Sequence, residues 1–311
     1  HDALPISIIF GYKGISPNIE PIQLPCGQCI GCRLERSRQW AMRCIHEAQL
    51  YENNCFITLT FNDDALFKRP NPWSVDVRDF QLFMKRLRKK FVPRNPHPEG
   101  SEEYQAHQLK YAIRFYHCGE YGAKNGRPHY HACLFNFDFP DKKLWKISNG
   151  HRLYISDILQ SLWSDSETGD PLGFCTIGDV TFESAAYVAR YIMKKVNGDL
   201  QDEHYTDSDG VCIEPEYTTM SRRPGIGRHW LDEYIDDVYP HDFIVINGRK
   251  CKPPKYYDGV LESERPYEFD EVKENRLTKL EKYADDNTPE RLAVRERVQE
   301  ARLKLLVRNL D

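Results

Sequence analysis

The chain has 311 residues, a formal net charge of −4 and an aromatic content of 12%. This length allows one large domain or two smaller ones, while the charge excludes a generally basic protein, so any nucleic-acid surface must be a local patch. No apolar run approaches membrane-spanning length, and the 10 cysteines without a secretory pattern predict a reducing, cytoplasmic setting.

The hydrophobic pattern predicts a mixture of strands and helices. In chain order we expect a turn-rich knuckle at 25–32, helices at 33–51, 77–91, 155–163 and 183–196, strands at 55–61 and 174–180, and a hairpin of 110–122 with 127–137. We expect an exposed acidic loop at 197–216 and charged helices from about 260 onward. This order predicts an α+β fold, in which a mainly antiparallel central sheet has helices on one face and leaves the other face free for a ligand.

The same patterns divide the chain into four segments. Residues 1–6, HDALPI, resemble a translated sequencing adapter and are excluded from the fold prediction. Residues 7–54 are expected to form an N-terminal segment with the knuckle and a helix, residues 55–250 the main domain, and residues 251–311 a helical C-terminal extension.

The segment GRPHYHACLF (126–135) carries two histidines around one tyrosine. Because side chains alternate across a strand, His129 and His131 share a face and make half of a metal site. A four-residue loop, AKNG, would place Glu120 opposite His129, whereas a two-residue turn, NG, would place it opposite His131. Either register gives a credible three-ligand set for a divalent ion such as Mn²⁺ or Mg²⁺. An ordinary Glu–His pair on a half-exposed strand is the alternative.

The helix expected at 183–196 carries two tyrosines one turn apart. At 100° per residue, Tyr187 and Tyr191 lie about 40° apart on the polar face, opposite the apolar arc. Lys194 falls beside Tyr187, while Arg190 and Lys195 lie farther round. Cations favour the phenolate and bind phosphate, so this face suits a tyrosine nucleophile. Two half-buried tyrosines packed beside lysine stems are the alternative.

Three cysteines crowd the knuckle PCGQCIGC. Cys26, Cys29 and Cys32 are spaced closely enough to hold one Zn²⁺, with Cys44 or His46 as a fourth ligand. A structural zinc is the leading hypothesis. An iron–sulfur cluster fits less well because no fourth cysteine follows at the ferredoxin spacing, and free thiols are the alternative.

Other residues are weaker candidates for DNA contacts. Thr58 and Thr60 in ITLTF share one face of a strand, where small hydroxyls would allow a DNA strand to approach closely. The cations that could grip a DNA backbone are Arg190, Lys195, Arg222, Arg223, Arg228 and those of the helix at 77–91. Ordinary solvated charge is the alternative for each cation.

Together, ITLTF, RPHYH and YVARYIMKK occur in an order that resembles the three motifs of HUH endonucleases. Those enzymes start rolling-circle replication or process single strands. The chain is more similar still to the replication initiators of small circular single-stranded-DNA phages, the gokushovirus branch of the Microviridae. PCGQCIGCR, YHCGEYG and MSRRPGIG also resemble that branch, and the resemblance covers roughly residues 25–235.

The resemblance implies a role for each residue that matches a motif. His129 and His131 would bind the divalent ion with Glu120 as the third ligand, Tyr187 and Tyr191 would be the paired nucleophiles, and Lys194 would be the lysine of their motif. The knuckle belongs to the phage branch and not to HUH enzymes generally, so its zinc role carries over least securely.

The implied activity is that of a nickase and strand transferase which uses a 5′-phosphotyrosyl intermediate and an HUH-type domain at 55–250. Its partners would be single-stranded DNA at a phage origin and the host polymerase and helicase, in the cytoplasm of an infected bacterium. A plasmid relaxase or transposase would use the same chemistry on other DNA. A zinc-stabilised nucleic-acid-binding module without catalysis is the alternative from another class.

Overall fold

The computed structural model describes residues 6–8, 22–24, 27, 29–122, 125–148, 150–190, 201–206, 210–282, 286 and 288–305. The described strands are β1 (Ile6–Ile8), β2 (Ile22–Leu24), β3 (Asn54–Leu59), β4 (Arg114–Tyr121), β5 (Pro128–Phe135), β6 (Lys143–Ser148), β7 (His151–Ile155), β8 (Cys175–Gly178), β9 (Tyr217–Met220), β10 (Ile244–Ile246) and β11 (Arg249–Cys251). The described helices are α1 (Ile30–Gln49), α2 (Asp63–Phe67), α3 (Val77–Phe91), α4 (Glu102–Tyr111), α5 (Asp157–Leu162), α6 (Phe182–Arg190), α7 (Gln201–His204), α8 (Arg228–Val238), α9 (Lys255–Glu264), α10 (Pro266–Glu281) and α11 (Pro289–Leu305).

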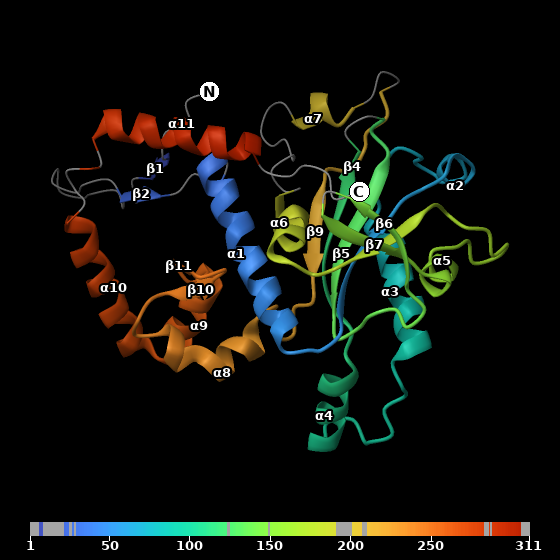
Figure 1. Cartoon of the computed structure of the whole chain (residues 1–311), viewed down its shortest axis with the longest axis horizontal. Coiled ribbons are helices and arrows are strands. Elements are labelled where there is room, and N and C mark those ends of the chain that lie inside the picture. Colours follow the sequence, from blue (N-terminus) through green and yellow to red (C-terminus); the bar gives the residue numbers. More distant parts are fainter. Residues whose placement is uncertain are drawn as a thin grey trace, which may run out of the picture.

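A seven-stranded antiparallel sheet forms the centre of the main domain (Figure 1). Its strand order is β6-β7-β8-β3-β5-β4-β9, so that β3 and β5 lie in the middle. Both strands are apolar on successive residues because both of their faces are covered, and five of the six β3 residues are buried. The predicted α+β fold with a mainly antiparallel sheet is confirmed.

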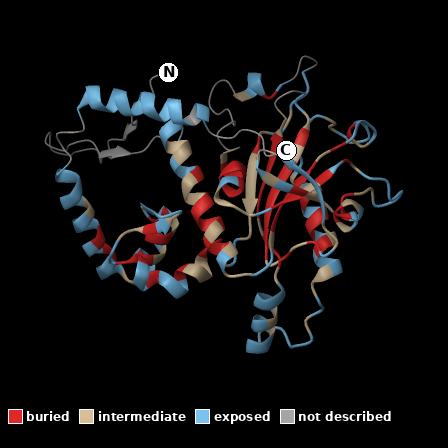
Figure 2. Cartoon of the chain, viewed as in Figure 1, coloured by how far each residue is buried: buried red, intermediate tan, exposed pale blue. Residues whose placement is uncertain are grey.

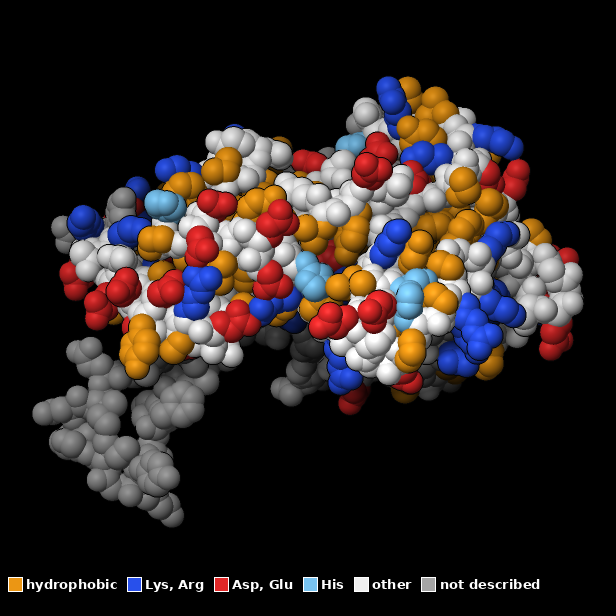
Figure 3. All heavy atoms as spheres, turned by 90° about the horizontal axis from the view of Figure 1, so that it is seen from below, with side chains coloured by type: hydrophobic (Ala, Val, Ile, Leu, Met, Phe, Trp, Pro, Cys, Tyr) orange, Lys and Arg blue, Asp and Glu red, His pale blue; other side chains and the backbone are white. Residues whose placement is uncertain are grey.

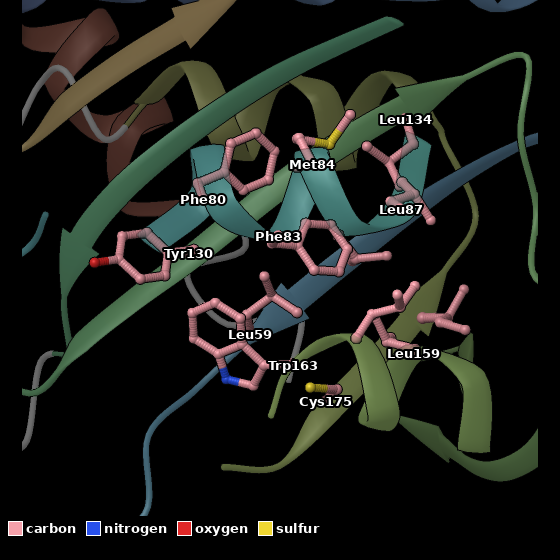
Figure 4. Packing of buried hydrophobic residues seen from close by; sticks show 14 of the residues in the cluster. Leu59, Phe80, Phe83, Met84, Leu87, Tyr130, Leu134, Leu159, Trp163 and Cys175 are labelled. Atoms are coloured by element: carbon pink, nitrogen blue, oxygen red, sulfur yellow. The ribbon is translucent and has the colours of Figure 1, made fainter. Parts of the chain in front are cut away.

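Helices cover both faces of this sheet, so the prediction of one covered face is wrong. On one face α3 and α5 pack on alternate residues of β3 and β5, as Figure 4 shows for Phe80, Phe83 and Tyr130. On the opposite face α6 and part of α1 cover the other alternate residues, among them Phe56 and Cys133. The sequence hides this arrangement because α1 precedes the sheet strands and returns to cover α6 only in three dimensions.

Helix α3 begins and ends where its pattern predicts, at 77 and 91. The side chain of Asp76 caps its first turn by accepting a hydrogen bond from the backbone N–H of Arg78. The apolar residues recur at helical spacing, and this stripe lies on the sheet.

Helix α1 separates two cores. One side of it packs against α6, while Met42 on the other side joins a core built from α8, α9 and α10. Figure 1 shows α1 between the sheet and these C-terminal helices, and Figure 2 shows buried residues along the middle of α1 on a chain whose last helix is exposed. The helical C-terminal segment is thus observed, but α8 begins its core before residue 251.

Several elements escape the sequence patterns. Strand β6 is exposed along most of its length, so it shows no alternation, and α4 buries none of its residues. The short α7 lies within the segment 197–216, where we expected a loop, and β9 follows just beyond that segment. No helix in the described part of the chain is long and apolar enough to cross a membrane.

Candidate active site

The β4–β5 hairpin has the register of the longer predicted loop. Glu120 pairs with His129, and the backbone N–H of Gly122 donates to the carbonyl of Arg127 at 2.9 Å to close the loop. The alternation of β5 then puts His129 and His131 on the same face of the sheet, as predicted. Glu120 lies on that face as well, because it reaches His131.

Three side chains from three strands meet at His131. Its Nε2 lies 2.9 Å from Oε1 of Glu120, and its Nδ1 lies 3.0 Å from Oγ1 of Thr58. All three side chains are buried, and only 1% of His131 is exposed. A neutral imidazole carries one N–H, so when Nε2–H donates to the carboxylate, Nδ1 accepts a hydrogen bond from the Thr58 hydroxyl.

Helix α6 brings Tyr187 directly over this histidine. The two rings meet edge to face with centroids 5.2 Å apart, and the guanidinium of Arg190 lies 6.0 Å from the centre of the tyrosine ring. Tyr187 is buried between α6 and the sheet, not on a polar outer face as predicted. The reason is that α1 covers the other side of α6, where Ser37 donates a hydrogen bond to the carbonyl of Ala186 at 3.1 Å.

The donor set fits a divalent ion, although the side chains are not gathered around one. The described residues contain no group of three or more His, Cys, Asp or Glu side chains already placed to hold a metal. The imidazole of His129 nevertheless packs onto Gly122, where an added Cβ would come 2.7 Å from Cε1. Rotation of Glu120 away from Nε2 would give His129, His131 and Glu120 a common opening, and the Thr58 hydroxyl would then accept from Nδ1–H.

The sequence suggested Thr58 only as a residue that lets DNA approach. Its contact with His131 spans 73 residues of sequence and follows from the pairing of β3 with β5, in which the two residues are direct partners. That pairing of ITLTF with HYH was the signal that would have revealed it. Thr60 instead bonds the backbone carbonyl of Phe174, at 2.8 Å.

The structure does not bring the proposed zinc ligands together. Cys29 caps α1, its sulfur accepting from the backbone N–H of Cys32 at 3.5 Å. Cys44 lies about four turns beyond Cys32 on the same helix, roughly 18 Å away at 1.5 Å per residue. Burial raises the pKa of the Cys44 thiol well above 9.0. His46 is buried too, with Nδ1 2.8 Å from the hydroxyl of Tyr257. Neither fourth ligand reaches the knuckle.

The predicted DNA-contacting cations have different fates. Arg228 pairs with Asp232 and Glu264, both at 2.7 Å, so it ties α8 to α9. Arg222 and Arg223 are exposed. The cations of α3 lie across the sheet from His131, because α3 covers the opposite face. In the view from below, acidic and basic side chains mix over the C-terminal helices at the left, while lysines and arginines gather at the right (Figure 3).

Four predicted site residues lie outside the described residues: Cys26, Tyr191, Lys194 and Lys195.

Comparison with known proteins places this geometry in a family. The model of a family described as replication-associated protein ORF2 matches residues 54–196, the segment that carries the site. The replication-associated protein VP4 of Bdellovibrio phage phiMH2K is 33% identical over 262 residues, which are 83% of this chain and 74% of that protein.

Two further relatives have the same kind of name. The replication-associated protein ORF2 of Spiroplasma virus 4 is 32% identical over 81% of this chain and 72% of its own length. The replication-associated protein ORF4 of Chlamydia phage 1 is 28% identical over 82% of this chain, which spans 58% of that protein. No solved structure matches the chain, so the HUH fold stays a prediction from the motifs.

Proposed function

Because the chain belongs to the replication-associated protein ORF2 family of Microviridae-type phages, we propose that it is a metal-dependent, site-specific nickase and strand transferase for single-stranded DNA. The observation that carries the proposal is the position of Tyr187, whose ring meets His131 at 5.2 Å beside Glu120. A nucleophile of this kind must lie next to the groups that position the phosphate.

Tyr187 would attack the scissile phosphorus. A bond forms between Oη and phosphorus, the bond from phosphorus to O3′ breaks, and the phenol proton ends on O3′ to leave a free 3′-hydroxyl. The products are a 5′-phosphotyrosyl protein and a 3′ end that host polymerase can extend. Arg190, next to the ring, favours the developing negative charge on the phenol oxygen.

His129, His131 and Glu120 would hold the metal, which would polarise a non-bridging phosphate oxygen. Thr58 keeps the ring of His131 in place, and Gly122 leaves room for the ring of His129. The second tyrosine of the motif, Tyr191, would cleave the regenerated origin after a round of synthesis. The released 3′-hydroxyl then attacks the first phosphotyrosyl bond and closes the circle, so that joining needs no nucleotide.

This mechanism fits a setting in the cytoplasm of an infected bacterium, where host polymerase and helicase would act on the nicked strand. Zinc at the knuckle would be structural and has no part in the steps above.

The proposal is tested with single-stranded oligonucleotides that tile the phage genome encoding the chain, incubated with the protein and Mn²⁺ or Mg²⁺. Oligonucleotides labelled at the 3′ end should give a protein-linked band in denaturing electrophoresis, and those labelled at the 5′ end a shortened strand. Tyr187→Phe should reduce the adduct at least tenfold, and the variant that also carries Tyr191→Phe should abolish it.

A labelled adduct from the 5′-labelled strand instead would contradict the proposed polarity. Absence of any adduct with DNA binding intact would favour the binding module without catalysis. An adduct that survives in the double tyrosine variant would exclude these tyrosines as the nucleophiles.

A further inference from the structure

An exposed pair of aromatic rings stands on the outer strands of the sheet. Phe174, just before β8, and Trp145, on β6, have ring centroids 4.9 Å apart, and they are 48% and 44% exposed. The register of β6 with β7 shifts between Leu144 and Lys146, which leaves Trp145 outside the regular ladder. Such a bulge redirects a side chain, and here Trp145 packs on Phe174.

This pair lies on the same face of the sheet as the candidate metal ligands. Thr58 pairs with His131 on one side and with Thr176 on the other, so these three residues form one row across β5, β3 and β8. Strands β5 and β8 run in the same direction, since each is antiparallel to β3. Moving two residues back along each strand leads to His129 and to Phe174 on that same face.

The distance between the two features follows from the strand spacing. Two steps of about 4.8 Å separate β8 from β5, so Phe174 lies about 10 Å from His129 across the sheet. Helix α6 packs over β4 and β5, whereas the half-exposed Phe174 shows that the face is open at β8. A strand whose phosphate sits at His129 and His131 can therefore extend over the aromatic pair.

The surroundings of the pair are positively charged. The ammonium of Lys146 lies 4.3 Å from the centre of the Trp145 ring, and the neighbouring Arg152 is exposed on β7. Lys146 pairs with Leu153, which packs near Gly178 on the face of the candidate site. Exposed rings among cations are the combination with which proteins stack bases and hold a single-stranded backbone.

We propose that Phe174 and Trp145 form a stacking platform for a base next to the scissile phosphate, with Lys146 beside the backbone. The inference rests on the proposed function, because it takes single-stranded DNA as the occupant. The platform would fix which phosphate reaches Tyr187, and its stacking would hold the strand in place through the nicking step.

The chain offers a matched control. Phe67 and Trp73 form a second exposed pair, with centroids 6.1 Å apart and exposures of 64% and 38%. Residues next to this pair, Leu66 and Val75, belong to the core on the opposite face of the sheet. A general affinity of exposed rings for DNA would involve both pairs, whereas the proposed platform involves only Phe174 and Trp145.

The test measures affinity by fluorescence anisotropy with the full chain, in EDTA and at fixed salt, so that no nicking is needed. The probes are a labelled 20-nucleotide oligo-dT and a labelled 20-unit abasic strand, which has the same backbone without bases. Phe174→Leu and Trp145→Leu keep the apolar bulk but remove the rings. Each should weaken oligo-dT binding by about 5- to 150-fold and leave abasic binding unchanged, and Phe174→Tyr should restore it.

Phe67→Leu should change neither affinity. Unchanged oligo-dT binding in Phe174→Leu and Trp145→Leu would overturn the platform and point to a protein as the occupant of this surface. An equal loss on both probes would overturn it as well, because the rings would then not act through bases. Failure of the tyrosine adduct alone, with the base-dependent loss intact, would remove the proposed function and leave the binding surface.

Discussion

Two buried histidines on neighbouring strands differ in one contact. His131 on β5 and His117 on β4 are 1% and 0% exposed, and each has Nδ1 3.0 Å from a threonine hydroxyl, that of Thr58 or of Thr219. At Nε2 they diverge. His131 meets the carboxylate of Glu120, whereas in the described part of the chain no hydrogen-bond partner reaches Nε2 of His117.

Their ring neighbours differ in the same way. His117 stacks on Phe80 of α3 with centroids 3.6 Å apart, in the core of the other face. Burial lowers its pKa well below 6.5, which keeps the imidazole neutral. His131 faces Tyr187 and a carboxylate instead. A buried histidine thus indicates a site only when its outer nitrogen and its ring face meet reactive groups, and the threonine contact alone does not distinguish the two.

The largest expected effect comes from removing one histidine or the other. His131→Ala should reduce formation of the protein–DNA adduct by on the order of 10³-fold, because loss of a metal ligand removes several kcal/mol of stabilisation from the transition state. His117→Phe fills the stack on Phe80 and removes a polar atom that has no partner, so adduct formation should stay within about twofold of the wild type.

The measurement is the rate of adduct formation at saturating Mn²⁺, with circular dichroism to confirm that both variants fold. Equal losses in the two variants would show that His131 is a structural histidine like His117.

The two threonines give a finer test of the same comparison. Thr58→Val should weaken Mn²⁺ binding by about 10- to 100-fold, because the valine offers no oxygen to orient His131, and Thr58→Ser should restore it. Thr219→Val is the matched control on His117 and should leave Mn²⁺ affinity unchanged. Isothermal titration of Mn²⁺ into the full chain measures this without DNA. Normal affinity in Thr58→Val would place the metal elsewhere or exclude it.

Local patterns were enough to predict the elements that bury one regular stripe. Helix α3 begins and ends at the predicted residues, and the hairpin register that pairs Glu120 with His129 was one of two expected from its loop. The family, too, was recognised from short motifs, and the comparisons confirm it.

Long-range packing decided the rest. Thr58 contacts His131 only because two strands separated by 73 residues are paired. Tyr187 is buried because α1 covers α6, which the pattern of 183–196 alone cannot reveal. Strand β6 is exposed and carries a register shift, so its sequence lacks the alternation that identifies a strand, and Trp145 gave no sign of its place near the site.

A third buried histidine extends the comparison to stability. His46 stacks on Trp230 with centroids 3.5 Å apart, and burial lowers its pKa from 6.5 to about 3. Below pH 6.5 the unfolded chain binds a proton at this position and the folded chain does not, so stability is present above pH 6.5 and falls as the pH drops toward 3. At pH 5 the loss is about 2 kcal/mol. Urea unfolding of His46→Phe at pH 7.5 and pH 5 should show a pH dependence smaller by this amount than that of the wild type, even if the loss of the Tyr257 contact lowers its stability at both values. An unchanged pH dependence would mean that His46 is protonated in the folded protein, and the rule that an apolar ring neighbour keeps a buried histidine neutral would then fail for this chain.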